Sequence, residues 1–265
     1  MALEFPPLGA PFLALIATVI VAGVARGMSG FGSGMIIAPV AAAIYGPQVA
    51  IPMLTVLETL PTIPVTIPAL PLVRWREVLP VTVGLAVFLP VGVYVLSNSD
   101  AEMLRWFICA AILVCAALLW TGWRYRGPRD LPVSFGVGGL SGLLTGIASI
   151  PGPPVIFYWM ASDLPAKAVR ANLLAFFLLG DFLSIVSFWL ADLFKPDVLG
   201  IGIGAMPFYF GALLIGSKLH GLASDATYRR VTFFLIVLSA ILALPLIQPL
   251  FGMMAPATGS NLPGT

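Results

Sequence analysis

Residues 8–39 read LGAPFLALIATVIVAGVARGMSGFGSGMIIAP, an apolar run that passes into a glycine-rich interruption at Arg26. The apolar run, residues 8–26, is long enough as a helix to cross the roughly 30 Å hydrocarbon core of a bilayer. The interruption sets glycine and hydroxyl residues between Arg26 and Pro39. Because non-helical backbone survives at membrane depth only where it is buried in protein or lines a polar cavity, the stretch predicts a membrane helix that breaks.

The whole chain has the composition of an integral membrane protein. Of its 265 residues, 60% are hydrophobic and 9% are charged, whereas soluble domains carry about 25% charged residues. The net charge of +2 is too small to indicate nucleic acid as a partner. Cys109 and Cys115 would lie on different faces of one helix, so we expect buried apolar side chains there rather than a disulfide. No cofactor and no metal are expected.

Charged positions and proline- or glycine-rich positions divide the chain into ten apolar segments. The second and seventh are about 13 residues long, too short to span a bilayer comfortably, and are expected to be half-helices or re-entrant arms. The sequence therefore predicts an all-α polytopic integral membrane protein with eight full spans and two short elements. The expected segments are 8–26, 34–46, 48–72, 78–97, 103–121, 131–148, 150–162, 170–191, 198–216 and 230–250.

The basic residues give the expected orientation, because cytoplasmic loops collect lysine and arginine. If the N-terminus lies outside, only Arg105 and Lys195 fall on the outer side. The sequence thus predicts a multi-pass protein whose N- and C-termini are both periplasmic. The residues expected on the cytoplasmic side are Arg26, Arg74, Arg76, Arg124, Arg126, Arg129, Lys167, Arg170, Lys218, Arg229 and Arg230.

The segment order indicates a duplication. The basic stretch 123–130, WRYRGPRD, divides the ten segments five and five. An odd number per half makes the second half an inverted repeat of the first, a plan found in many secondary transporters. GMSG at 27–30 recurs as GLSG at 139–142, each followed by a further glycine and a proline at equal spacing, although Pro47 and Pro165 align better after an insertion. The expected units are an N-terminal membrane repeat (1–122), a cytoplasmic linker (123–130), a C-terminal membrane repeat (131–252) and a short polar tail (253–265).

The two interruptions are the predicted substrate site. A break exposes free N–H groups at the start of the next half-helix, and these groups with the helix dipole attract anions. The second interruption lies at 141–154, SGLLTGIASIPGPP. The alternative is that the glycines only allow close helix packing. Hydroxyl and aromatic candidates for lining the site are Ser29, Ser33, Thr145, Ser149 and Tyr158.

Several charged or amide side chains are further candidates. Arg26 adjoins the first break and its guanidinium suits an oxyanion, although a basic residue at a helix end also serves as an interfacial anchor. Arg170, with Asn172 close by, has the same two interpretations. Glu58 and Asp181 lie within apolar segments, where a carboxylate is costly. They are expected either to couple transport to protons or another ion or to form structural pairs in the interior.

The chain resembles the sulfite exporter TauE/SafE family, also called the toluene sulfonate uptake permeases. The resemblance rests on GMSGFGSG at 27–34 with Pro39, on SGLLTGIASIPGPPVIFYW at 141–159, and on the two halves of spans. The family motifs often have glycine where this chain has Ser33 and where it has residues 148–150. The positions that carry over from the family as site residues are Gly30, Gly32, Gly34, Pro39, Gly146, Gly152, Pro153 and Pro154.

The resemblance implies a secondary carrier in a bacterial inner membrane. Its substrate would be a small anion such as sulfite, sulfoacetate or another sulfonate, and H⁺ or Na⁺ would be the coupling ion. Membrane lipid is the expected surrounding, and a homodimer is left open. An anion channel is the closer alternative, because it would use the same broken helices. An intramembrane serine protease is a remote one: GMSG matches its nucleophile motif, but the single histidine, His220, falls in a loop.

Overall fold

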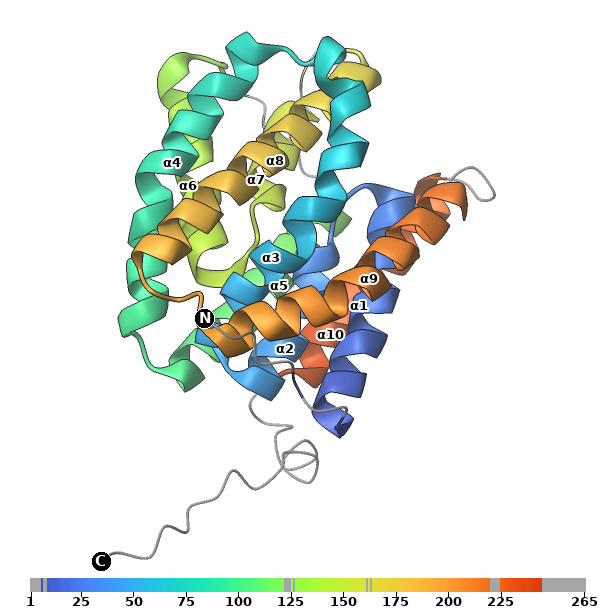
Figure 1. Cartoon of the computed structure of the whole chain (residues 1–265). Coiled ribbons are helices and arrows are strands. Elements are labelled where there is room, and N and C mark those ends of the chain that lie inside the picture. The colour runs from blue at the N-terminus through green and yellow to red at the C-terminus, as the bar shows by residue number, and fades with distance from the viewer. Residues whose placement is uncertain are drawn as a thin grey trace, which may run out of the picture.

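The chain folds into a bundle of helices in the order that the sequence predicts (Figure 1). This computed structural model describes residues 6, 9–121, 125, 127–160, 162, 164–219 and 225–244, with backbone alone for residues 29 and 225–230. Its helices are α1 (Ala10–Ser29), α2 (Ser33–Tyr45), α3 (Pro47–Thr66), the 3₁₀ helix η1 (Ile67–Leu72), α4 (Trp75–Asn98), α5 (Ala101–Trp120), α6 (Leu131–Ala148), α7 (Gly152–Trp159), α8 (Ala166–Leu190), α9 (Pro196–Leu219) and α10 (Asp225–Leu242).

Seven helices in the described part of the chain are long and apolar enough to cross a membrane. The remaining long element, α10, has 18 residues, of which Val231–Leu242 are the apolar part. The prediction of an all-α integral membrane protein is confirmed. Most boundaries lie within a few residues of the prediction, and α7 and α10 differ more. Helix α7 has only 8 residues, because Ile150 and Pro151 belong to the break before it, and α10 ends at Leu242 rather than at residue 250.

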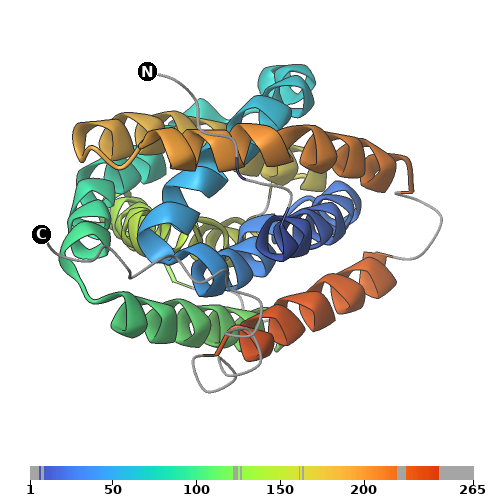
Figure 2. The ribbon, with the colours of Figure 1, turned by 60° about the horizontal axis from the view of Figure 1, so that its bottom comes forward.

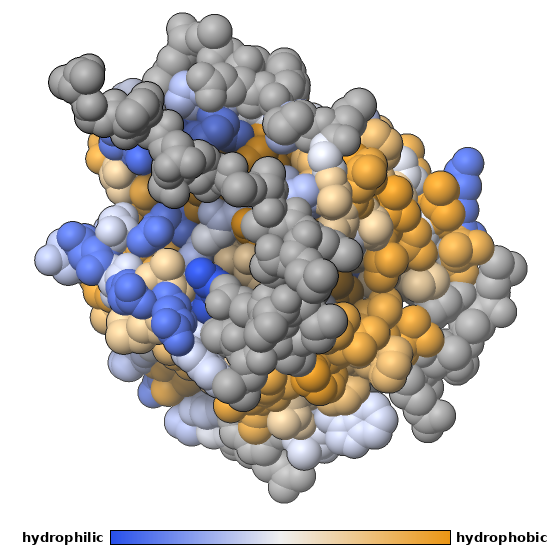
Figure 3. All heavy atoms as spheres, turned by 90° about the horizontal axis from the view of Figure 1, so that it is seen from below, coloured by the Kyte–Doolittle hydropathy of each residue, from blue (hydrophilic) through white to orange (hydrophobic). Residues whose placement is uncertain are grey.

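The outer surface of the bundle is apolar, as a lipid-facing surface must be. Along α4, Val83, Val87 and Val91 form a stripe with about half of each side chain exposed, whereas Leu85 and Leu89 on the opposite face are buried. Figure 3 shows such hydrophobic residues spread over one flank of the molecule seen from below. Both the exposed and the buried face of α4 are therefore apolar, so the helix has no polar face toward its surroundings.

Two helix pairs make the closest backbone approaches, α1 with α9 and α4 with α6 (Figures 1 and 2). In the first pair, a Cβ on Gly23 of α1 would lie 3.0 Å from the carbonyl oxygen of Tyr209. In the second, a Cβ on Gly146 of α6 would lie 2.6 Å from the backbone nitrogen of Val93. Glycine is required in both places because the backbones touch, which is the packing role of small residues in membrane helices.

The two breaks share one backbone feature. Helix α1 ends at Gly30 (φ 84°) and α6 ends at Ser149 (φ 55°), both in the left-handed conformation that commonly terminates helices. The sequence echo had aligned Gly30 with Gly142, but Gly142 lies within α6 and packs against α4. The echo is therefore out of register with the breaks by about two helical turns. Pro47 is the first residue of α3, and Pro165 directly precedes α8.

Candidate functional site

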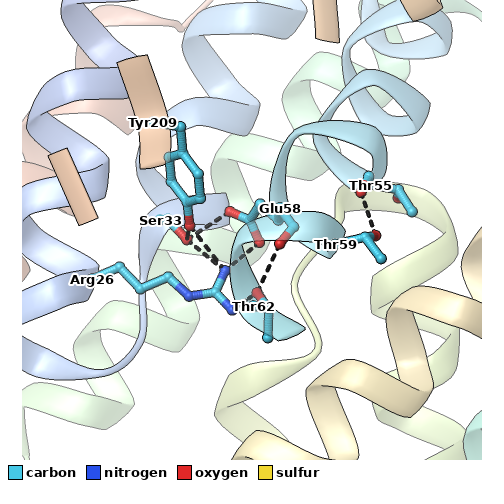
Figure 4. A network of polar contacts seen from close by, with 7 residues as sticks. All are labelled: Arg26, Ser33, Thr55, Glu58, Thr59, Thr62 and Tyr209. Carbon is cyan, nitrogen blue, oxygen red and sulfur yellow. Dashed lines mark hydrogen bonds and ion pairs between the residues drawn. The ribbon is translucent and has the colours of Figure 1, made fainter. Parts of the chain in front are cut away.

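A charged network lies where α1 breaks (Figure 4). The Arg26 guanidinium, on the last turn of α1, pairs with the Glu58 carboxylate of α3, Nη1 to Oε2 at 2.6 Å. The same Nη1 donates to the hydroxyls of Ser33 and Tyr209, each at 3.1 Å. Nη2 donates to the Thr62 hydroxyl at 3.2 Å. Residues from α1, α2, α3 and α9 thus meet at a single guanidinium.

Glu58 is held as firmly as its partner. Its second oxygen, Oε1, accepts a hydrogen bond from the Ser33 hydroxyl at 2.6 Å. The side chains of Arg26 and Glu58 are only 11% and 13% exposed. Charges so far from water are tolerated only when they are paired and further hydrogen-bonded, as these are. Arg26 is therefore an interior residue in a buried ion pair rather than a free interfacial anchor, and its predicted place on the cytoplasmic side stays a prediction.

Asp181 provides a second carboxylate in the same region. It comes from α8 and lines the cavity together with Arg26 and Glu58. Its Oδ2 atom is buried and has no hydrogen-bond partner within the described residues. A buried carboxylate oxygen without a partner is costly. The atom is available to a proton, a cation or a polar group that enters the cavity.

The two breaks meet at this cavity. A Cβ on Gly34, in the first turn of α2, would lie 2.7 Å from the carbonyl oxygen of Ser149, which ends α6. The cavity has a volume of about 50 Å³. A single water needs roughly 10–15 Å³ of such volume. It is large enough for a small anion. Its lining comprises Arg26, Phe31, Gly32, Ser33, Gly34, Met35, Glu58, Ser149, Ile150, Pro151, Gly152, Pro153, Ile156, Phe177 and Asp181.

The helix starts at the two breaks differ in their hydrogen-bond donors. Neither α2 nor α7 has a side-chain cap at its N-terminus. The first turn of α2 carries the N–H groups of Ser33, Gly34 and Met35, which have no acceptor within the helix. The first turn of α7 contains Pro153 and Pro154, which have no N–H. The expectation of free donors at both breaks holds for α2 and fails for most of the first turn of α7.

The structure brings most of the predicted site residues to one place. The substrate-site candidates that line the cavity are Arg26, Gly32, Ser33, Gly34, Ser149, Gly152 and Pro153. Both coupling candidates, Glu58 and Asp181, line it too. These residues come from five helices and from the breaks between them. The side chain of Ser29 lies outside the described residues, as does His220.

Other predicted site residues lie elsewhere, and most of them have a structural role of their own. The Tyr158 hydroxyl is 2.7 Å from that of Ser134, below the Arg129 guanidinium. Asn172 is fully buried and accepts from the backbone N–H of Arg74 at 2.8 Å. Thr145 donates to the Ser141 carbonyl, Gly146 packs on α4, Gly30 caps α1, and Arg170 is exposed on α8.

Sequence reasoning missed two polar members of the network and several apolar wall residues. Thr62 lies four residues after Glu58, so the same helix face carries both, and that spacing could have identified it. Tyr209 bears the only hydroxyl in the predicted segment 198–216, but its distance in sequence from Arg26 hid the contact. The apolar wall residues Phe31, Met35, Ile150, Pro151, Ile156 and Phe177 looked like ordinary membrane residues.

A multi-pass helical bundle with two broken helices around a buried charged cavity is the architecture of a membrane transport protein. Residues 15–243 match the model of the sulfite exporter TauE/SafE family, and the chain belongs to that family. It is a transporter and not an enzyme, so the protease alternative is excluded. A probable sulfite/organosulfonate exporter TauE of Cupriavidus necator is 31% identical over 231 residues, covering 83% of this chain and 89% of that protein. No solved structure matches the chain.

Proposed function

We propose that this protein is a secondary transporter that moves a small organosulfur anion, such as sulfite, sulfoacetate or another sulfonate, across the bacterial inner membrane. The observation that carries the proposal is the buried Arg26 side chain, which lines the cavity where the two breaks meet. The positive ends of α2 and α7 face the same space. The similarity to a probable sulfite/organosulfonate exporter supports the substrate class.

An inverted repeat and alternating access form the mechanistic part of the proposal. Helix packing supports the repeat, because exchanging the first five helices with the last five turns the α1–α9 pair into the α6–α4 pair. The same exchange turns α3–α9 into α8–α4, which also pack together. Both glycine-packed pairs combine one helix from each half. The bodies that rock are therefore two mixed bundles, one around α1 and α9 and one around α4 and α6.

Coupling to an ion gradient and the orientation complete the proposal. Glu58 and Asp181 are the residues that would carry the coupling, with H⁺ favoured over Na⁺ because both carboxylates share one small cavity with an arginine. With Arg26 removed from the count, ten basic residues remain on the proposed cytoplasmic side and two on the outer side. Periplasmic N- and C-termini fit that distribution.

The experiment begins with ligand binding and ends with flux. Purified protein is screened by thermal unfolding against sulfite, sulfoacetate, taurine, isethionate, sulfate and carboxylate analogues, because a ligand that binds the folded state raises its melting temperature. The best ligand is then tested in proteoliposomes. Saturable uptake with counterflow supports a carrier. Ohmic single-channel current supports an anion channel instead, and the absence of any stabilising anion contradicts the proposed function.

A further inference from the structure

We propose that Glu58 is an internal competitor of the transported anion, and that the anion reaches Arg26 only when Glu58 takes up a proton. The inference rests on the proposed function and concerns how the same cavity admits its ligand. In the structure, Glu58 occupies Nη1 of Arg26 at 2.6 Å. The positive charge to which an anion would bind is already neutralised by a carboxylate of the same chain.

The charge balance of the cavity explains why displacement needs a proton. The charged residues among its lining are Arg26, Glu58 and Asp181. With both carboxylates ionised, they sum to one negative charge, which repels an entering anion in a site poor in water. If Glu58 gains one proton as one monovalent anion enters, the sum stays at one negative charge. The proton comes from bulk water, no covalent bond to the anion forms, and anion and proton enter together.

The surrounding hydroxyl groups are arranged to accept either state of Glu58. Ser33 donates to Oε1 of the carboxylate at 2.6 Å and accepts from Tyr209 at 3.1 Å. A hydroxyl is both donor and acceptor and can rotate. Ser33 therefore donates to an ionised Glu58. Because Arg26 and Tyr209 fill its two acceptor positions, it accepts from a protonated Glu58 once Arg26 has turned to the anion. Glu58 loses its ion pair on protonation but keeps a hydrogen-bond partner.

The titratable neighbours of Glu58 come from three helices and play different parts. Arg26 of α1 is the contested partner, and Tyr209 of α9 donates to the same Ser33 hydroxyl. Asp181 of α8 shares the cavity but forms no ion pair with Arg26, and its Oδ2 has no partner in the described part of the chain. Removing Asp181 changes the background charge, whereas removing Glu58 removes the competitor.

The test measures binding of simple sulfonates to the purified full-length protein between pH 5 and 9. Methanesulfonate, isethionate and benzenesulfonate are monoanions throughout this range, so any pH dependence belongs to the protein. For the wild type we expect affinity to fall as the pH rises, by about tenfold per pH unit where each bound anion requires the uptake of one proton. We also expect uptake of about one proton per anion bound, measured with an indicator in weak buffer.

Three variants separate the competitor from its surroundings. Glu58→Gln should bind sulfonates at least tenfold more tightly than the wild type at high pH and with no dependence on pH. Asp181→Asn should keep the wild-type dependence on pH. Glu102→Gln, an exposed residue at the start of α5, is the matched control and should behave as the wild type does. The proton uptake of the wild type tests the inference even if Glu58→Gln does not fold.

Each outcome either supports or overturns the competition by Glu58. The outcomes also show whether the competition, the proposed transport function or both have failed. Wild-type binding without proton uptake, or with the same affinity and slope as Glu58→Gln, overturns the competition and leaves anion transport standing. Binding by Glu58→Gln alone supports the competition and contradicts the proposed function. If neither protein binds any of the three sulfonates, both fail, because Arg26 without its competitor should then have held an anion.

Discussion

The two helix breaks serve one cavity with opposite chemistry. The first, between α1 and α2, has two glycines with positive φ, Gly30 and Gly32, and brings Arg26 and Ser33 to the cavity. The second, between α6 and α7, has one serine with positive φ, Ser149, and continues into a proline-rich helix start. One break supplies charge and hydrogen-bond donors, and the other supplies a stiff wall.

The apolar side chains around the second break extend this difference. Ile150, Ile156 and Phe177 line the cavity close to the Pro151–Pro153 stretch. One side of the cavity therefore carries the Arg26–Glu58 ion pair, and the other side is aliphatic and aromatic. Such a division suits an anion that carries a small organic group, because the polar end can pair while the apolar end leaves water. The two breaks thus have complementary roles in one cavity.

The largest expected effect follows from removing the charge of the first break. Arg26→Ala should weaken binding of the best sulfonate by about 100-fold or more, because charge-assisted hydrogen bonds contribute roughly 1.5–3 kcal/mol each. It should also lower stability by about 3–5 kcal/mol, because Glu58 stays buried without a counter-ion. Binding isotherms and thermal unfolding measure the two effects.

Two further variants protect this test from a failure to fold. The double variant Arg26→Gln with Glu58→Gln removes both charges while keeping similar shapes, and it should fold without binding anions. Arg170→Ala, which removes an exposed arginine from α8, is the matched control. If the double variant binds sulfonates with wild-type affinity, Arg26 has only a structural role. The first break would then not differ from the second by supplying the charge that binds the anion.

The sequence predicted the order of helices and the meeting of the breaks better than it predicted individual contacts. Long apolar runs and the intervening glycine and proline positions determine where membrane helices begin and end, so each of the ten expected segments overlaps a helix of the structure. Arg26 and Glu58 could be singled out because a charge in an apolar run is rare. Their pairing was one of the alternatives, but the contact with Tyr209 depends on how α9 crosses α1, which no local pattern records.

The glycine motifs carried two signals that the sequence alone could not separate. Gly32 and Gly34 lie at the break, whereas Gly142 and Gly146 lie within α6 and pack on the backbone of α4. Both uses favour glycine for steric reasons, so the same residue type marks a cavity in one half and a helix contact in the other. The prolines are more specific than the glycines, because Pro153 and Pro154 exclude N–H donors at two positions of the first turn of α7.

A smaller effect is expected where the two breaks touch. Gly34→Ala places a methyl group 2.7 Å from the carbonyl oxygen of Ser149, a backbone atom that cannot turn away. The breaks must then separate, at a cost of roughly 1–3 kcal/mol in stability, and the uptake rate should fall. Gly136→Ala in α6 is the matched control, because its added methyl meets no atom within 4 Å. Equal melting temperatures and uptake rates in the two variants would contradict a tight contact between the breaks.

The smallest effect compares the two left-handed residues directly. Gly30→Ala should destabilise the protein by about 1 kcal/mol, because φ of 84° is unfavourable for a residue with a Cβ. Ser149→Gly removes that strain at φ 55° but adds freedom to the unfolded chain, so it should stabilise by only a few tenths of a kcal/mol. Thermal unfolding of both variants gives the signs. If Ser149→Gly destabilises as much as Gly30→Ala, then the Ser149 side chain holds the second break through contacts of its own, and the stiffness of that break does not come from its prolines alone.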